Sequence, residues 1–228
     1  IIVFKWIIRI LVCMIIFVPA GSWCGDLTPK QILRRPDEAR GNLDGVEWKV
    51  QIASVERGRK KKRVLRVKAR GYDFLGVFLS PPKVKGQKIL MIDHNMWFVR
   101  PQLAKPVPIT PRQKLIGAAN YGDVAATNYS DDYEVKSLSD EMFNGEQCYL
   151  FDLKAITKKA TYDRIKYWIS RKRLVGLKAE YYTVSGKMLK SALFESAHQI
   201  KVGDEIRPFI SKMFIRDALV SENVTTLT

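Results

Sequence analysis

The chain has 228 residues, of which 46% are hydrophobic and 27% are charged. This hydrophobic fraction is ordinary for a globular core, and so many charged residues argue against a polytopic membrane protein. The formal net charge is +16, but Lys and Arg are spread singly along the chain and no zinc-finger, helix-turn-helix or RNA-recognition signature is present. We therefore expect no nucleic-acid partner, and favour anionic lipid head groups or an acidic partner.

The first 22 residues have the pattern of a secretory signal peptide. Lys5 and Arg9 lie among apolar residues, a further apolar run follows, and proline and small residues close the segment. Ala20 and Ser22 occupy the −3 and −1 positions, which predicts cleavage after residue 22 and a single mature domain at 23–228. An uncleaved N-terminal anchor is the alternative, but the apolar run is short for a bilayer span.

Cys24 raises a rival interpretation, that of a lipidated cysteine at the start of a lipoprotein. Trp23 precedes it, where a lipobox needs a small residue, so simple export is favoured over lipid anchoring. A pair formed by Cys24 and Cys148 is one disulfide option in an oxidising compartment, although two cysteines do not establish it. Cys148 lies in the run QCYLFDL, which predicts a buried strand residue. No Cys/His spacing indicates a metal site, and we expect no cofactor.

Residues 26–42 predict a short helix. Thr28 can act as its N-cap, with Pro29 at the first helical position. Gly41 predicts its end, and Pro36 predicts a break or kink within it. Its expected apolar contacts with a sheet are Ile32 and Leu33.

From Val46 onward the period of the apolar residues changes to two, which indicates half-buried antiparallel strands. Asn144-Gly145 and Ser185-Gly186 are hairpin signals. Residues 208–219 and 224–227 close the chain as the last two strands. About ten or eleven antiparallel strands at regular spacing predict a large curved sheet or an open barrel, mainly β with short helices.

The run RGRKKKR at residues 57–63 lies between two strand patterns. A charge run in this place is typical of a solvated hairpin tip. A contact with anionic lipid or an acidic surface is the functional alternative.

The stretch 96–129 interrupts the strands. Its strand pattern breaks at three prolines and restarts at Thr110-Pro111 as a short helical segment, RQKLIGAA. Such a helix is too short to persist alone in water, so it must pack on the sheet. We interpret this segment, with its helix at residues 113–119, as a lid or plug over a β-lined cavity.

No catalytic set competes with that interpretation. His94 and His198 have no Ser or Cys motif around them, and no metalloprotease, phosphate-binding or dinucleotide signature is present. Asp131-Asp132 is typical of a solvated turn, and Asp123 is expected to cap the chain at the end of the lid. We therefore predict no catalytic residues and no enzyme activity.

Two stretches, FLSPPKVKGQKILMIDHNMWFVRP and ITPRQKLIGAANYGDVAATNYSDDY, resemble the central signature of the outer-membrane lipoprotein-sorting proteins. These are relatives of the periplasmic lipoprotein carrier LolA. The likeness covers residues 27–227 and is densest at 80–129. It implies a LolA/LolB-like, half-open antiparallel β-barrel with a helical lid and an apolar cavity for acyl chains. It also implies a periplasmic location, and for some members association with an RND-type inner-membrane exporter or an outer-membrane acceptor.

The leading interpretation is thus a monomeric periplasmic carrier that binds the acyl chains of a lipid or lipoprotein and transfers it toward the outer membrane. A non-transferring accessory subunit of a lipid-export complex and a lipid-acting enzyme are the alternatives. An ordinary solid core explains the same apolar residues, because strand parity does not tell which face lines a cavity. The candidate cavity or lid residues are Trp48, Val50, Leu65, Val67, Trp97, Leu115, Ile116, Ile165 and Tyr167.

Overall fold

The structure is a computed structural model that describes residues 27–43, 45–125 and 128–228. The predicted signal peptide and Cys24 lie outside these residues. The helices are α1 (Pro29–Ala39), the 3-10 helix η1 (Pro82–Val84), α2 (Gly122–Ala125) and α3 (Tyr129–Asp132). The strands of the first half are β1 (Val46–Glu56), β2 (Arg59–Arg70), β3 (Asp73–Ser80), β4 (Lys88–Ile92), β5 (Asn95–Val99), β6 (Val107–Ile109), β7 (Lys114–Ile116) and β8 (Ala119–Asn120). Those of the second half are β9 (Tyr133–Phe143), β10 (Glu146–Ala155), β11 (Arg164–Ser170), β12 (Gly176–Tyr182), β13 (Met188–Glu195), β14 (His198–Val202), β15 (Glu205–Phe209), β16 (Lys212–Asp217) and β17 (Val224–Leu227).

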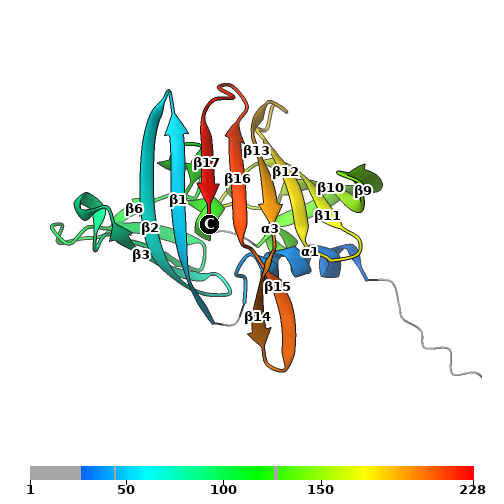
Figure 1. The fold of residues 1–228 in the computed structure, drawn as a ribbon, viewed down its shortest axis with the longest axis horizontal. Coiled ribbons are helices and arrows are strands. Elements are labelled where there is room, and N and C mark those ends of the chain that lie inside the picture. The colour runs from blue at the N-terminus through cyan, green and yellow to red at the C-terminus, as the bar shows by residue number, and fades with distance from the viewer. Residues whose placement is uncertain (1–26, 44, 126–127) are drawn as a thin grey trace, which may run out of the picture.

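Two β-halves are joined edge to edge by the first and last strands of the fold. Within the described residues, a 13-stranded antiparallel sheet has the order β6-β5-β4-β3-β2-β1-β17-β16-β13-β12-β11-β10-β9 (Figure 1). β1 pairs with β17 over four register positions, from Ile52 opposite Leu227 to Val55 opposite Val224. The predicted mainly-β fold with a large open sheet and short helices is confirmed. The sheet has more strands than the ten or eleven expected because short strands such as β6 join its edge.

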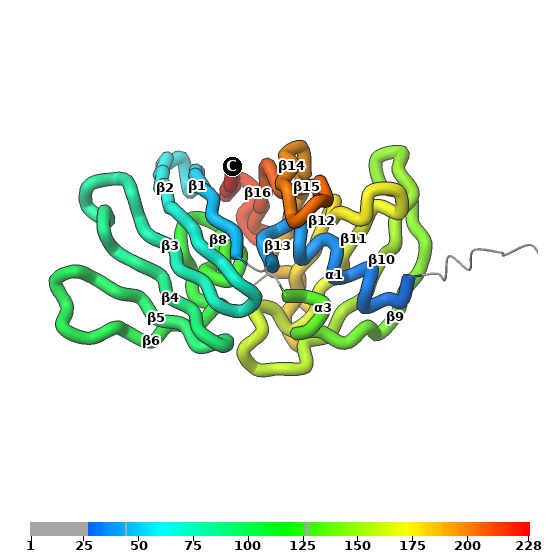
Figure 2. Tube along the Cα trace, turned by 90° about the horizontal axis from the view of Figure 1, so that it is seen from below, coloured from blue at the N-terminus to red at the C-terminus, as the bar shows by residue number. Residues whose placement is uncertain are grey.

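The hollow between the two halves holds the core. Figure 2 shows the halves facing each other, with α1, α3 and β8 between them. Alternation along each strand sends one set of side chains into this hollow. On β2, for example, Leu65 and Val67 are fully buried, whereas Arg66 and Lys68 are exposed.

Helix α1 forms where the sequence predicted it and covers part of the hollow. Thr28 and Gln31 form a reciprocal capping box, in which the Gln31 side chain accepts from the Thr28 backbone N–H at 2.8 Å. Gly41, with φ at +105°, ends the helix. The expected break at Pro36 is wrong, because the helix continues through it to Ala39 with the proline ring buried. Burial of this helix face against the core offsets the backbone hydrogen bond that proline cannot make.

The segment 110–125, which we call the plug, has a different secondary structure from the one that the sequence predicts. Residues 113–119 are not a helix but the hairpin β7–β8, followed by the short helix α2. Gly117 turns the hairpin with φ at +57°, a left-handed conformation that would interrupt a helix. Leu115, Ile116 and Ala119 are buried, so the plug fills the centre of the hollow.

Three further differences between the prediction and the structure concern the ends of strands and the turns between them. The run predicted as the last strand but one, residues 208–219, divides into the end of β15 and all of β16. β14 was not predicted, and with β15 it forms a hairpin that projects beyond the main sheet (Figure 1). The basic run 57–63 turns at Arg57-Gly58, and the remaining cations belong to strand β2, where residues 59–62 are exposed.

Gly117 allows a close approach between the plug and the seam of the two halves. A methyl group there would collide with Thr225 on β17 and Ser54 on β1. We expect Gly117→Ala to lower the free energy of unfolding by about 1–3 kcal/mol more than Gly145→Ala, measured by urea denaturation. Gly145 is the matched control because its φ is +79° and its surroundings are open. Equal losses for the two variants would contradict a tightly seated plug.

Candidate functional site

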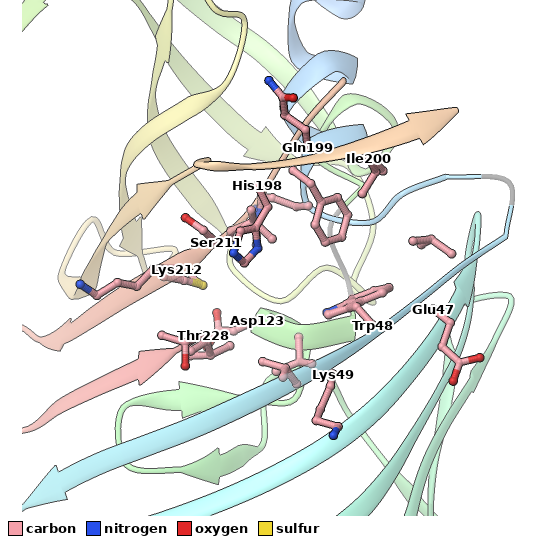
Figure 3. A pocket seen from close by; sticks show the side chains of 18 residues that line it. Glu47, Trp48, Lys49, Asp123, His198, Gln199, Ile200, Ser211, Lys212 and Thr228 are labelled. Carbon is pink, nitrogen blue, oxygen red and sulfur yellow. The ribbon is translucent and has the colours of Figure 1, made fainter. Parts of the chain in front are cut away.

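An apolar cavity of about 290 Å³ lies beside the plug. It is bounded by β1, by the β14–β15 hairpin with the start of β16, by the end of β17, and by α2 of the plug (Figure 3). Its apolar lining residues are Val46, Trp48, Val50, Val124, Ile200, Phe209, Ile210, Met213 and Leu227. Its polar lining residues are Arg40, Glu47, Lys49, Asp123, His198, Gln199, Ser211, Lys212 and Thr228.

The cavity has a buried end and an exposed mouth. Val124 and Met213 are 7% and 1% exposed, whereas Lys49 and Gln199 are exposed. Trp48 stands between them: its ring packs edge-on against Phe209, with the ring centroids 5.7 Å apart. A polar mouth and an apolar interior suit an amphiphilic ligand.

The plug is fixed in the hollow by a buried lysine. Lys190 on β13 donates to Asp123 Oδ2 at 2.6 Å, to the Ala118 carbonyl at 2.8 Å and to Asn120 Oδ1 at 3.3 Å. The side chain of Asp123 is fully buried and that of Lys190 is 6% exposed. Burial lowers the pKa of Lys190, and the facing Asp123 carboxylate opposes this shift.

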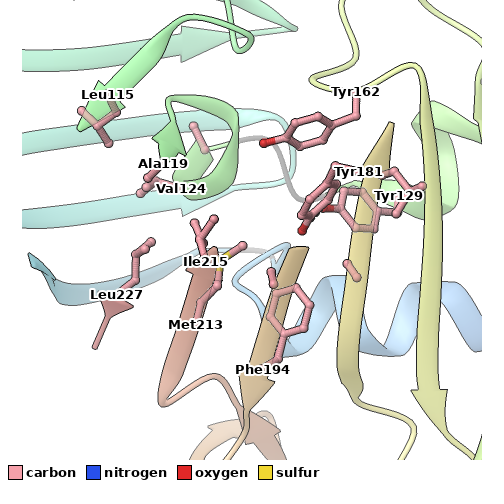
Figure 4. Packing of buried hydrophobic residues seen from close by; sticks show 14 of the residues in the cluster. Leu115, Ala119, Val124, Tyr129, Tyr162, Tyr181, Phe194, Met213, Ile215 and Leu227 are labelled. Atoms are coloured by element: carbon pink, nitrogen blue, oxygen red, sulfur yellow. Dashed lines mark hydrogen bonds between the residues drawn. The ribbon is translucent and has the colours of Figure 1, made fainter. Parts of the chain in front are cut away.

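The Asp123 carboxylate is fully satisfied. Its Oδ2 also accepts from the Asn120 backbone N–H at 2.7 Å, which is the capping role expected from the sequence, and its Oδ1 accepts from the Tyr162 hydroxyl at 2.6 Å. Burial and the Asp123 charge raise the pKa of Tyr162, so that its hydroxyl stays protonated and donates. Tyr162 stacks on Tyr181 at 4.1 Å, and Tyr181 adjoins Tyr129 (Figure 4).

A second hollow of about 660 Å³ lies on the other side of the plug. Phe98, Leu115 and Tyr121 contribute apolar surface, and several cations stand around it. Its charged lining residues are Arg63, Lys83, Arg100 and Lys114. Lys114 pairs with Glu56, and Arg63 donates to the Leu115 carbonyl at 3.1 Å, so two of these cations are engaged in holding the plug.

Helix α1 ends in two buried charged residues. Asp37 Oδ2 accepts from the Ser130 backbone N–H at 2.7 Å, and burial raises the pKa of Asp37 to about 7. The Arg40 guanidinium lies over the rings of Tyr129 and Phe194, 4.8 and 5.1 Å from their centroids. Arg40 lines the cavity, and both its terminal nitrogens lack a hydrogen-bond partner among the described residues.

Comparison with known proteins identifies the family. A family model described as "-like: Uncharacterized protein" matches residues 71–228. A LolA superfamily protein from Nitrosomonas europaea superposes with a TM-score of 0.78 at 28% identity, covering 88% of this chain and 90% of its own. The chain belongs to the LolA superfamily.

Two further structures share the LolA-superfamily fold. A domain assigned to the outer membrane lipoprotein-sorting proteins, from Vibrio parahaemolyticus, has a TM-score of 0.71 at 20% identity and covers 86% of this chain and 88% of its own. A DUF1329 family protein from Desulfovibrio piger has a TM-score of 0.71 at 18% identity, covering 87% and 88%. No curated protein sequence matches the chain.

In this LolA-superfamily chain, the nine predicted residues fall in four places. Trp48 and Val50 line the cavity, and Leu115 lines the second hollow. Trp97 lies on the opposite face of the sheet, because its neighbours Met96 and Phe98 point into the core. The remaining five are buried in the core cluster of the concave face: Leu65, Val67, Ile116, Ile165 and Tyr167.

The prediction that Asp131 and Asp132 lie in a solvated turn holds for Asp131 only. Asp131 is exposed and pairs with Lys30 at 2.8 Å. Asp132 is 8% exposed and lies 3.0 Å from His94 Nε2, so the solvated-turn prediction is wrong for it. The reason is that these residues form α3, a single helical turn that directs Asp132 toward the β4–β5 turn.

Sequence reasoning missed Arg40 and Lys190. For both residues, the spacing to neighbouring core residues in the sequence indicates an inward-facing position. Lys190 shares the strand parity of Ala192 and Phe194, which face the core. Arg40 follows Leu33 by seven residues, which returns it to the same helix face. Both positions put a cation on an inward-facing side.

None of the helices in the described part of the chain is long and apolar enough to span a bilayer. Among the same residues, no three His, Cys, Asp or Glu side chains gather as a metal site would require. Cys148 is a buried free thiol, in agreement with its predicted strand position.

Removal of the buried cation should loosen the plug. We expect Lys190→Met to lower the free energy of unfolding by about 3–5 kcal/mol, because Asp123 then remains as a buried charge without its cation. The double variant Lys190→Met/Asp123→Asn should recover part of this loss, and Lys136→Met, which breaks an exposed ion pair, should change little. Urea denaturation measures all three. A double variant no more stable than Lys190→Met would contradict the ion-pair explanation.

The raised pKa of Asp37 predicts that this residue lowers the free energy of unfolding in a pH-dependent way. The native state favours the protonated carboxyl, so its penalty is absent below about pH 4 and complete above about pH 7. Asp37→Asn should therefore gain stability relative to the wild type as the pH rises through this window, by up to about 4 kcal/mol. Unfolding free energies measured from pH 4.5 to 7.5 test this. Parallel curves for the two proteins would show that Asp37 does not titrate in this way.

Proposed function

We propose that this chain is a periplasmic carrier that holds an acyl chain of a lipid or lipoprotein in the 290 Å³ cavity and delivers it toward the outer membrane. The observation that carries the proposal is an apolar interior behind a polar mouth, in a fold shared with lipoprotein-sorting proteins. The signal-peptide pattern of the first 22 residues supports export. The sequence resemblance makes an RND-type exporter the donor and an outer-membrane component the acceptor in this proposal.

The volume sets the size of the cargo. A methylene group occupies about as much space as a water molecule, roughly 30 Å³, so the cavity has room for roughly ten of them. Each contributes about 0.8 kcal/mol when it leaves water. Ten give about 8 kcal/mol before the costs of association, so micromolar affinity is the upper bound and the net affinity is weaker. Burial alone thus suffices for reversible binding, and no chemical step is needed.

The β14–β15 hairpin is the part of the wall best suited to move. Most of its residues are exposed, including Ile206 at 70%. It is held to α1 by the Arg207–Glu38 ion pair at 2.9 Å and by the Ile210 N–H to the Ala39 carbonyl at 2.8 Å. A segment with so few buried contacts opens at low free-energy cost, which allows loading and release.

Two substitutions on this hairpin test the carrier. Ile200 is half-buried and lines the cavity, whereas Ile206 is exposed and does not. We expect native mass spectrometry of protein purified from its own periplasm to detect a bound lipid on the wild type and on Ile206→Trp. Ile200→Trp should lose it, because the larger ring occupies the lipid's space.

Other results of these experiments would contradict the carrier or favour a different function. An empty wild-type protein that also fails to bind added lipid would rule out the carrier. An empty protein held stably by an exporter would indicate the accessory subunit. Turnover of a lipid would indicate an enzyme.

A further inference from the structure

The second hollow, on the far side of the plug from the cavity, gathers positive charge that no acid balances. Arg63, Lys83, Arg100 and Lys114 line it, and none of its described lining residues is an aspartate or a glutamate. Within the described part of the chain only Lys114 among these four forms an ion pair, with Glu56. Cations gathered around one concave space attract an anionic ligand and repel a cationic one.

Arg63 presents part of its guanidinium to this hollow. It lies half-buried on β2, with its Cζ 5.6 Å from the centroid of the Phe78 ring. One of its nitrogens, Nη1, donates to the Leu115 carbonyl. The other nitrogens bond to no described residue and are not among the sealed polar atoms of the protein, so they remain accessible to a ligand. Burial lowers the pKa of Arg63 without any carboxylate to offset the shift, and the guanidinium still remains protonated.

Tyr121 of the plug adds a hydroxyl close to two of these cations. Its ring centroid lies 6.3 Å from that of Phe98, and the Arg100 guanidinium lies 5.4 Å from the Phe98 centroid. Burial raises the pKa of Tyr121, and the charges of Arg63 and Arg100 oppose this shift. The hydroxyl bonds to no described residue, yet it is not sealed from solvent. Two guanidinium groups and a phenol thus offer unused donors to the same hollow.

The hollow also has apolar surface that an inorganic anion would leave uncovered. Leu115 is buried in its wall and Ile109 is half-buried. Leu103 and Val107, which also line it, are 46% and 43% exposed. Exposed apolar side chains beside a few polar donors are typical of a site for a ligand that is itself part polar and part apolar.

We propose that the second hollow binds the phosphate head group of an anionic lipid, with donors from Arg63, Arg100 and the Tyr121 hydroxyl. A planar guanidinium matches two phosphate oxygens with parallel hydrogen bonds. The volume of about 660 Å³ has room for roughly twenty groups of the size of a methylene. It therefore takes the head group, the glycerol and the first carbons of the acyl chains, which cover the apolar side chains. This site is separate from the 290 Å³ cavity, so the inference does not depend on the proposed function.

The test compares two lipids with the same short chains and different head-group charges. Dihexanoyl phosphatidylglycerol is anionic and dihexanoyl phosphatidylcholine is zwitterionic, and both are titrated into the full chain as monomers, at neutral pH and low salt, by isothermal titration calorimetry. Charge-assisted hydrogen bonds, with no choline cation to be repelled, should make the phosphatidylglycerol bind about 10-fold more tightly or better. Equal affinities would overturn the proposal.

Inorganic phosphate tells a lipid site from a site for the free anion. It has the charge of the head group without the apolar part, so we expect it to displace the phosphatidylglycerol only weakly. Inorganic phosphate that binds as tightly as the lipid would overturn the lipid assignment.

Two variants assign the preference to the donors of the hollow. Arg100→Met and Tyr121→Phe each remove a group that bonds to no described residue, so both should fold like the wild type. Each should weaken the binding of phosphatidylglycerol by about 5-fold or more and leave that of phosphatidylcholine nearly unchanged. Arg66→Met is the matched control, because this arginine of β2 is exposed and does not line the hollow. It removes the same charge and should keep the preference. A preference undiminished in both Arg100→Met and Tyr121→Phe would overturn the proposal.

Arg63→Met needs a second measurement, because Arg63 also holds the plug through the Leu115 carbonyl. We expect the largest loss of phosphatidylglycerol binding in this variant, and urea denaturation shows whether the fold is kept. If Arg63→Met does not fold, Arg100→Met and Tyr121→Phe decide.

Ile200→Trp separates this site from the cavity. The larger ring fills the cavity and not the hollow, so this variant should bind phosphatidylglycerol as the wild type does. Loss of binding in Ile200→Trp would place the lipid in the cavity, which overturns the second site and leaves the carrier intact. A retained preference together with an empty cavity would support the second site and overturn the carrier alone.

Discussion

A lysine inside a β-sheet core is tolerated only where its protons have acceptors, and this constraint organises the molecule. All three acceptors of Lys190 belong to the plug: a carbonyl, an amide oxygen and the Asp123 carboxylate. The plug must therefore occupy one place on the concave face, or a buried charge is left unpaired. Hydrophobic packing alone would not be so selective, because apolar surfaces slide against one another without a comparable penalty.

The position of the plug decides where the interior stays open. It takes the centre of the hollow, and space remains on either side, as an apolar cavity near β17 and a more basic hollow near β5 and β6. The two differ in their cations. Those around the second hollow are partly paired and near solvent, whereas the guanidinium of Arg40 is enclosed behind the wall of the first. The first cavity therefore has mainly apolar walls, and its exposed polar groups lie at the mouth.

The sequence predicted the strands well because period-two alternation is a local property, and Asn144-Gly145 and Ser185-Gly186 marked their turns. It failed at the plug, where apolar spacing suggested a helix although Gly117 required a left-handed turn. It could not assign Trp97, since alternation reveals two faces without naming the inner one. The roles of Lys190 and Arg40 depend on contacts with residues far away in the chain. The inward parity of both positions was visible, but their partners were not.

The pairing of β1 with β17 has a consequence for how the chain folds. Strand β1 pairs with a strand far along the chain, with Ile52 opposite Leu227. Such non-local contacts form slowly because a long loop must close first. The plug rests on this same seam, where Ala118 donates to Thr225 at 2.8 Å. Neither the core nor the cavity can be completed until the last four-residue strand has been synthesised. The hydrophobic interior is therefore finished late in folding, after the two β-halves have met along this seam.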